Sequence, residues 1–224
     1  MTFFFDTNVC IGYIFRWEPW HEKAKNLFNK NELSYWSDTV KDECANILQK
    51  LVQEYIIFLN NTKDKITDSK KNSFLMNDFL NIVKDIPIRL NYDGKEIIDK
   101  FKVIYDIFED EMWYDVSQHD LVIYLDKLSL NFRIRSFLKF RKCEEKLMLH
   151  PKTSNHDDTK KLFINNKIHY PDWQICLDAH DLGLTICDLI FVTADHKLCL
   201  YLDPILYKTN IKSILKLDRL SIFT

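Results

Sequence analysis

The chain has 224 residues, of which 46% are hydrophobic and 29% charged, and its formal net charge is -2. Three glycines and five prolines leave no room for low-complexity linkers, and no apolar run approaches the ~20 residues that cross a bilayer. The near-neutral charge does not by itself indicate a nucleic-acid-binding protein. The six cysteines include no CxxC pair, so we expect buried free thiols in a soluble, cytoplasmic protein.

A short apolar run opens the chain. Residues 2–5 include three consecutive phenylalanines without a polar interruption, which is typical of a strand buried on both faces of a parallel sheet. The run ends at Asp6, and Asn8 follows two residues later; polar residues of this kind shape a turn. Two short helical patterns come next, before a second strand that we expect at residues 33–36.

The following helix carries an acidic residue at the edge of its buried stripe. Val40, Cys44, Ile47 and Leu51 recur at helical spacing, and Glu43 lies beside this stripe rather than opposite it. An acid in the first turns of a helix has a common structural explanation, because it interacts favourably with the helix dipole. Taken alone, Glu43 fits that explanation better than a role as a metal ligand.

The middle of the chain, residues 50–151, is dominated by helical patterns. We expect helices at residues 74–86 and 97–108, and a third that breaks near Asn131. Residues 131–142 interleave basic and aromatic side chains, a composition compatible with binding along a phosphate backbone. An amphipathic helix with a solvated basic face is the commoner explanation and the one we favour.

A polar segment at residues 151–161 predicts a mobile loop. We assign its His156-Asp157-Asp158 sequence to loop polarity, because three consecutive residues do not converge easily on one ion.

A helix is expected to begin at Pro171 and to end at Gly183. Asp172 heads its apolar face, and an N-cap and a metal ligand are both compatible with that position. Asp178 lies about 120° away around the helix, which predicts an edge or solvent position.

The last clear strand, residues 189–192, is also apolar, and Thr193 and Asp195 follow it. Functional residues of parallel sheets gather beyond the carboxyl ends of the strands. Asp6 and Asp195, far apart in sequence, are therefore expected to meet at one edge of the sheet. The tail after residue 198 continues as a helix or strand that the pattern does not distinguish.

Four carboxylates stand out by position: Asp6, Glu43, Asp172 and Asp195. Within a few ångströms of one another they would repel unless a cation lay among them. Hard oxygen ligands in this number suit Mg²⁺ or Mn²⁺ rather than zinc, and such ions activate water for phosphodiester cleavage. We expect Asn8 and Thr193 to orient these carboxylates by hydrogen bonds.

These segments resemble the PIN-domain nucleases, a family that includes the toxin ribonucleases of toxin–antitoxin pairs. The matching features are a strand ending in Asp6-Thr7-Asn8, then Ser37-x-x-Val40-x-x-Glu43, Asp172-x-x-Ile175-x-x-x-Ala179 and Asp188-x-x-x-x-Thr193-x-Asp195. The resemblance implies a three-layer α/β/α, Rossmann-like fold around a parallel sheet, with metal-dependent endoribonuclease activity. It assigns as catalytic, metal-binding residues Asp6, Glu43, Asp172 and Asp195, with Mg²⁺ or Mn²⁺ as cofactor.

The resemblance covers residues 1–55 and 165–205. We therefore expect one PIN-like domain over residues 1–224, with a helical insertion at residues 60–160. If the helix after Pro171 is rotated, Asp178 replaces Asp172 or joins it in the site. His196 is expected to be a surface histidine, with contact to a substrate phosphate as the alternative.

The leading function is an endoribonuclease that hydrolyses single-stranded RNA. A DNA nuclease with the same four acids is one alternative. Another is a PIN scaffold that binds RNA or protein without cleavage, although four mutually repelling acids argue against it. A phosphatase or nucleotide-binding Rossmann protein is disfavoured, because no glycine-rich loop follows the first strand. For partners we expect RNA and no membrane, with a protein inhibitor or antitoxin and a homodimer as further candidates.

Overall fold

The computed structural model describes residues 1–30, 32–84, 86 and 115–217. The chain divides into two compact units. The first comprises Met1–Ile47 and Leu138–Thr224, and the second comprises Leu48–Phe137. The helix expected at residues 97–108 lies outside the described residues.

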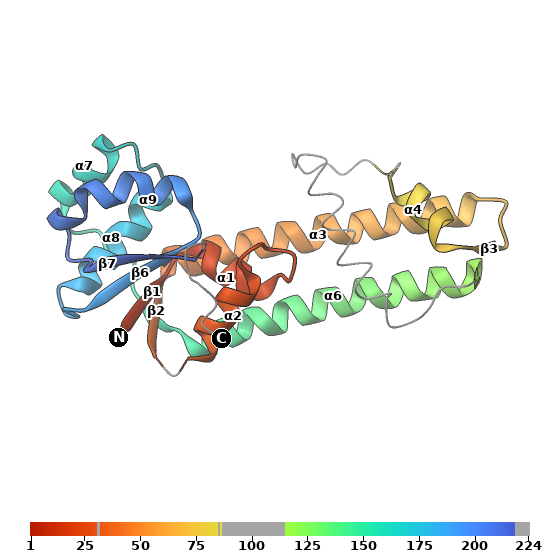
Figure 1. Ribbon diagram of the computed structural model, residues 1–224, viewed down its shortest axis with the longest axis horizontal. Helices are drawn as coiled ribbons and strands as arrows, with labels where there is room; N and C mark the ends of the chain where they lie inside the picture. Colours follow the sequence, from red (N-terminus) through yellow and green to blue (C-terminus); the bar gives the residue numbers. More distant parts are fainter. Residues whose placement is uncertain (31, 85, 87–114, 218–224) are drawn as a thin grey trace. The chain divides into compact units, whose positions relative to one another are not determined.

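A five-stranded sheet forms the centre of the first unit (Figure 1). Every neighbouring pair in it is parallel, and the strand order is β5-β2-β1-β6-β7. The strands are β1 (Thr2–Phe5), β2 (Leu33–Ser37), β5 (Met148–His150), β6 (Leu189–Thr193) and β7 (Ser213–Lys216). The apolar runs at residues 2–5 and 189–192 therefore supply the two central strands, as their composition predicts.

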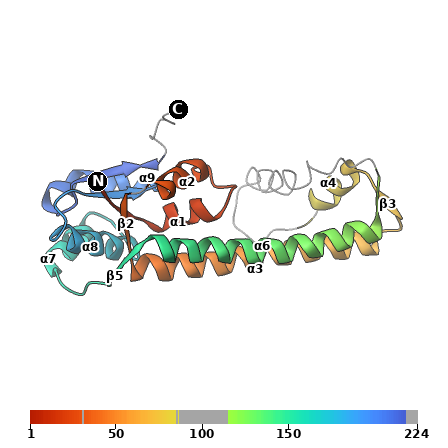
Figure 2. The ribbon, with the colours of Figure 1, turned by 90° about the horizontal axis from the view of Figure 1, so that it is seen from below.

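Helices of the first unit pack around this sheet (Figure 2). α8 (Asp172–Gly183) contacts β2 and β6, α1 (Thr7–Ile14) contacts β6, and α9 (His196–Leu202) contacts β7. α2 (His21–Asn29) packs on α1, α7 (Asp157–Asn165) packs on α8, and the 3-10 helix η1 (Asp203–Lys208) follows α9. The unit is thus an α/β fold on a parallel sheet, and this arrangement is compatible with three layers.

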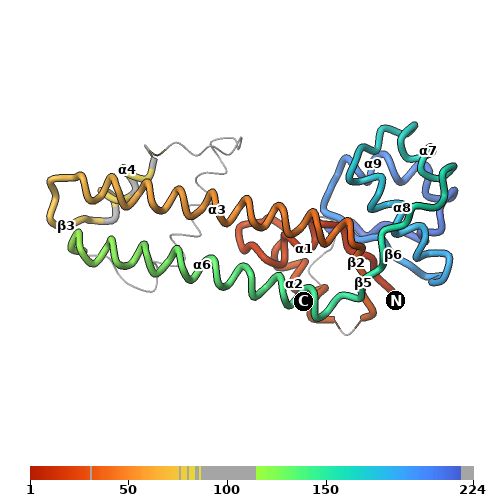
Figure 3. Tube along the Cα trace, turned by 180° about the vertical axis from the view of Figure 1, so that it is seen from behind, coloured from red at the N-terminus to blue at the C-terminus, as the bar shows by residue number. Residues whose placement is uncertain are grey.

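Two long helices make up most of the second unit, and both continue into the sequence of the first. They are α3 (Asp38–Asp68) and α6 (Gln118–Lys146). Within the second unit they lie side by side (Figure 3). The rings of Tyr55 and Phe132 are 4.1 Å apart there, and Lys63 pairs with Asp126 at 2.8 Å. α4 (Met76–Lys84) and the antiparallel pair β3 (Ser73–Phe74) and β4 (Val116–Ser117) complete the described part.

Three expectations about this middle region are wrong. α6 runs through Asn131 without a break, because Gln118–Lys146 contains neither proline nor glycine to interrupt the helix. The polar segment at residues 151–161 contains the start of α7 at Asp157. Residues 148–150 form strand β5, which no pattern indicated.

All six cysteines are free, and five are buried as expected, whereas Cys187 is exposed. None of the helices in the described ranges is long and apolar enough to cross a membrane.

Candidate acidic site

Asp6 follows β1 directly and is the N-cap of α1. Its Oδ1 accepts a 2.7 Å hydrogen bond from the Thr7 backbone N–H. Its Oδ2 accepts from the Thr193 hydroxyl at 2.6 Å and from the Asn8 side-chain amide at 3.4 Å. The carboxylate is buried, so its orientation is fixed by three donors from two neighbouring strand ends.

The environment of Asp6 disfavours its charge. Burial, together with the negative charges of Asp172 and Glu43, raises the pKa of Asp6 to about 7. The hydrogen bonds from Thr193 and Thr7 act in the opposite direction. A carboxylate placed in this way is stabilised in its ionised form by any cation that approaches it.

Glu43 comes from the second turn of α3 and is half-buried. The Thr7 hydroxyl donates a 2.6 Å hydrogen bond to Glu43 Oε2. Burial raises the pKa of this carboxyl as well. This hydrogen bond links the start of α3 to Thr7, the residue after Asp6. An acid that only interacted with the helix dipole would not need such a contact.

Asp172 and Asp195 lie at the starts of α8 and α9. The pKa of Asp172 is raised to about 6, mainly by burial and also by the charges of Asp195 and Glu43, with His169 acting in the opposite direction. Asp195 is the N-cap of α9, and its Oδ1 accepts from the backbone N–H groups of Lys197 and Leu198 at 2.7 and 3.0 Å. Its own N–H donates to the Thr193 hydroxyl at 2.9 Å.

The four acids therefore interact electrostatically as one group at the carboxyl edge of the sheet. Asp6 is affected by Asp172 and Glu43, and Asp172 is affected by Asp195 and Glu43. Thr193 contacts two members, because its hydroxyl donates to Asp6 and accepts from the Asp195 backbone. Asn8 contacts Asp6 through a longer hydrogen bond.

The chemistry of this group suits a hard divalent cation, because its donors are carboxylate oxygens. Across the described ranges, no three His, Cys, Asp or Glu side chains are arranged so that they could hold a metal ion as they stand. Burial is the main cause of the raised pKa values of Asp6 and Asp172, and the charges of the neighbouring acids act in the same direction. Three of the four acids, Glu43, Asp172 and Asp195, are partly exposed and therefore accessible to an ion.

Asp178 forms hydrogen bonds with a different set of residues from those that hold the four acids. Its Oδ1 accepts hydrogen bonds from the Thr153 backbone N–H at 3.0 Å and the Gln174 amide at 2.8 Å, and its Oδ2 accepts from the Thr39 hydroxyl at 2.8 Å. The edge or solvent position expected for Asp178 is wrong, because it is fully buried. The segment after β5 covers this face of α8, which the periodicity of the helix cannot reveal.

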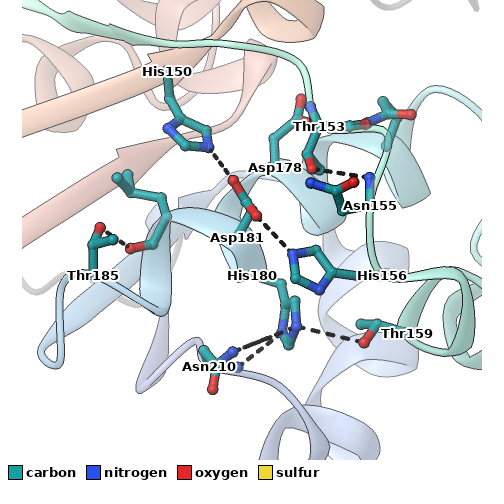
Figure 4. A network of polar contacts seen from close by, with 12 residues as sticks. His150, Thr153, Asn155, His156, Thr159, Asp178, His180, Asp181, Thr185 and Asn210 are labelled. Carbon is teal, nitrogen blue, oxygen red and sulfur yellow. Dashed lines mark hydrogen bonds and ion pairs between the residues drawn. The ribbon is translucent and has the colours of Figure 1, made fainter.

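A second polar network anchors the same segment and was not foreseen (Figure 4). Asp181 accepts contacts from His150 at 3.1 Å and from His156 at 2.6 Å. The rings of His156 and His180 meet edge to face at 5.0 Å, and the Asn210 backbone N–H donates to His180 Nδ1 at 3.1 Å. His156 was assigned to loop polarity, but its ring joins α8 to the turn that opens α7.

Two other basic groups have defined positions. Lys139, from the stretch at residues 131–142, donates to the backbone carbonyls of Tyr13 and Ile14 at 3.3 and 2.9 Å and so satisfies the end of α1. His196 is exposed, and its Nδ1 contacts the Lys216 ammonium at the end of β7. This contact brings a basic side chain from the end of β7 to the residue that follows Asp195 in the sequence.

No family model, curated protein or solved structure matches the chain.

Proposed function

We propose that the chain is a PIN-type, metal-dependent endoribonuclease with a three-layer α/β/α fold. The observation that carries this proposal is the mutual electrostatic effect of Asp6, Glu43, Asp172 and Asp195 at one edge of a parallel sheet. Each of the four comes from a different segment, and each follows a strand or begins a helix. Four like charges from separate segments cost stability when brought together, which is typical of a functional site.

In this proposal, Asp6, Glu43, Asp172 and Asp195 hold Mg²⁺ or Mn²⁺. The ion, when bound, supplies an activated water and stabilises the charge on the leaving oxygen. Asp6 is the most firmly oriented ligand, because both of its oxygens accept hydrogen bonds. Thr7 orients Glu43 through its hydroxyl, so residues 6 and 7 together set two of the four carboxylates.

His196 and Lys216 are the groups best placed to receive a phosphate of the substrate. They contact each other, His196 follows Asp195 in the sequence, and Lys216 pairs in register with Thr193. The positive charge of Lys216 would partly offset the repulsion between the four acids and a nucleic-acid substrate. This arrangement supports a nucleic acid as the substrate, and single-stranded RNA follows from the PIN resemblance.

The scaffold alternative is less well supported. A protein that only binds RNA gains nothing from the raised pKa values of Asp6 and Asp172, since burying such acids costs stability at neutral pH.

Cleavage of a mixed-sequence single-stranded RNA tests the proposal. The purified protein is incubated with Mn²⁺, with Mg²⁺ and with EDTA, next to the variants Asp6→Asn and Asp172→Asn. We expect cleavage to require the ion. In both variants the cleavage rate should fall by more than roughly 10–100-fold, which is the usual cost of losing a residue that only hydrogen-bonds to a metal ligand. Asp42→Asn is the matched control, because Asp42 is an exposed acid on α3, one residue before Glu43.

The outcomes separate the alternatives. Cleavage of single-stranded DNA at an equal rate would favour the DNA nuclease. Cleavage that persists in EDTA or in Asp172→Asn would contradict the proposed site. If the protein binds RNA, cleaves neither the RNA nor the DNA, and shows no Mn²⁺ binding in calorimetry, the scaffold alternative is supported.

A further inference from the structure

Two exposed aromatic rings flank Asp172 in the chain. Tyr170 is 63% exposed, and Trp173, in the first turn of α8, is partly exposed. Their ring centroids are 5.8 Å apart at an angle of 59°. Aromatic side chains usually bury much of their surface, whereas Tyr170 and, in part, Trp173 remain open to solvent on either side of Asp172 in the sequence.

Each ring is accompanied by a lysine. The Lys152 ammonium lies 5.9 Å from the centre of the Tyr170 ring, and the Lys160 ammonium lies 4.6 Å from the centre of the Trp173 ring. Lys152 follows β5 and Lys160 is on α7. Three separate segments thus bring two aromatic faces and two positive charges to one place.

The segments that carry the lysines are held against α8. The Thr153 N–H donates to Asp178, and the Gln174 amide donates to the Thr153 carbonyl at 2.9 Å. His156, three residues after Thr153, contacts Asp181 (Figure 4). The Lys152 N–H also donates to Asp38 at 3.2 Å. These hydrogen bonds hold the backbone at Lys152 and Thr153, so the lysine begins from a fixed position within reach of the Tyr170 ring.

We propose that Tyr170 and Trp173 form a stacking platform for unpaired bases of single-stranded RNA, with Lys152 and Lys160 contacting the adjacent phosphates. The combination of aromatic faces with nearby cations is the chemistry by which proteins bind single strands without a sequence code. The platform rests on the proposed function, since its use is to place the strand next to Asp172. Tyr170 and Trp173 are positioning residues in this scheme.

The platform also accounts for a preference for single strands. Bases in a duplex are already stacked on their neighbours and do not offer a free face to a protein ring. A duplex would reach only the lysines, through its phosphates. Binding of a duplex is therefore expected to depend on salt and on Lys152 and Lys160, without a contribution from Tyr170.

Binding without cleavage provides the test. Fluorescence anisotropy in EDTA measures the affinity of the full-length protein for a labelled ten-nucleotide single-stranded RNA. Tyr170→Leu retains apolar bulk but removes the ring, and Tyr170→Phe retains the ring. Tyr207→Leu is the matched control, because Tyr207 is 79% exposed and has the Lys208 ammonium 5.5 Å from its ring centre, on η1. A second strand in which the bases are replaced by abasic sites reports phosphate contacts alone.

We expect Tyr170→Leu to weaken binding of the normal strand by about five- to a hundredfold, the usual effect of losing one base stack. Tyr170→Phe and Tyr207→Leu should bind like the wild type, and the abasic strand should not distinguish Tyr170→Leu from the wild type. Unchanged binding in Tyr170→Leu, an equal loss in Tyr207→Leu, an equal loss on the abasic strand, or no binding by the wild type would overturn the platform.

The binding test and the cleavage test distinguish failure of the platform from failure of the proposed function. Metal-dependent cleavage together with unchanged binding in Tyr170→Leu removes the platform and leaves the nuclease. Ring-dependent binding without any cleavage leaves the platform and removes the nuclease.

Discussion

Thr193 and Asp6 lie 187 positions apart in the chain, yet the Thr193 hydroxyl donates a 2.6 Å hydrogen bond to Asp6 Oδ2. The pairing of β6 with β1 sets Val192 opposite Phe5, so the residues that follow the two strands are neighbours. The same hydroxyl accepts a hydrogen bond from the Asp195 N–H. One side chain thus holds two of the four acids in their places.

Replacing Thr193 by valine tests this relationship. The substitution keeps the shape of the side chain but removes a donor that favours the charged form of Asp6, so the pKa of Asp6 should rise further above about 7. We expect Mn²⁺ affinity at pH 7 to fall about tenfold or more and the pH needed for tight binding to increase. Calorimetric titration between pH 6 and 8.5 measures both. Thr193→Ser keeps the hydroxyl and should bind Mn²⁺ like the wild type, whereas an unaffected valine variant would refute the role.

The pH dependence of stability in EDTA has a predictable sign at Asp6. Its pKa is raised from 3.8 to about 7, so between these values the folded state holds a proton that the unfolded state has released. The contribution of Asp6 to stability is therefore greatest below about pH 4 and is lost as the pH rises towards 7. In the wild type, the free energy of unfolding should therefore fall by on the order of a few kcal/mol as the pH rises. Asp6→Asn, which has no carboxyl at this buried position, should not show this fall.

Urea unfolding of the wild type and Asp6→Asn at pH 5 and pH 8 measures this difference. Asp42→Asn should show the same pH dependence as the wild type. A parallel pH dependence in Asp6→Asn would contradict the raised pKa of Asp6.

Asp172→Asn should stabilise the metal-free protein. The substitution removes a charge that interacts unfavourably with Asp195 and Glu43. Because Asp172 is partly exposed, we expect a gain of only about 1 kcal/mol at pH 8, or roughly 2–4 °C in Tm. The gain should vanish at pH 5, where the wild-type carboxyl is protonated. Thermal unfolding in EDTA at the two pH values gives the comparison, and a lower Tm at pH 8 would show that the charge is already balanced.

Added Mn²⁺ should reverse the order of these two proteins. The wild type gains stability in proportion to the logarithm of the free ion concentration over Kd, whereas Asp172→Asn lacks a ligand. We expect Tm of the wild type to rise by several degrees at about 100 times Kd and Tm of the variant to respond much less. An identical response would place the ion elsewhere on the protein.

Asp178→Ala separates a structural acid from the proposed ligands. The change leaves the Thr39 hydroxyl, the Thr153 N–H and the Gln174 amide without their acceptor in a buried place. We expect a loss of about 3 kcal/mol or more in the free energy of unfolding. Urea denaturation measures it, and Mn²⁺ affinity should be retained where the variant is still folded. If the folded variant no longer bound Mn²⁺, Asp178 would have to be counted among the metal ligands.

The parts of the fold that could be predicted are those that depend on local pattern. The apolar runs at residues 2–5 and 189–192 are buried on both faces, and this requirement alone marks them as central strands. The parallel arrangement then explains why Asp6 and Asp195 end at the same edge. The pattern also identified the positions of Asp172 and Glu43 on their helices.

The parts that could not be predicted depend on which segment covers which face. β5 is a three-residue edge strand with Met148 and Leu149 about half exposed, so its composition carries little strand signal. Asp178 is buried only because the chain after β5 passes over α8. The contacts of His150 and His156 with Asp181 depend on the same passage, and no residue spacing indicates it.

The position of β1 in the sheet has a consequence for synthesis of the protein. β1 pairs with β2 on one side and with β6 on the other. β2 emerges from the ribosome soon after β1, but β6 must wait until residues 189–193 have been made. Until then one edge of β1 has no partner strand, Asp6 lacks the Thr193 hydroxyl, and Asp195 does not exist. The candidate acidic site therefore stays incomplete until the chain has been made as far as Asp195.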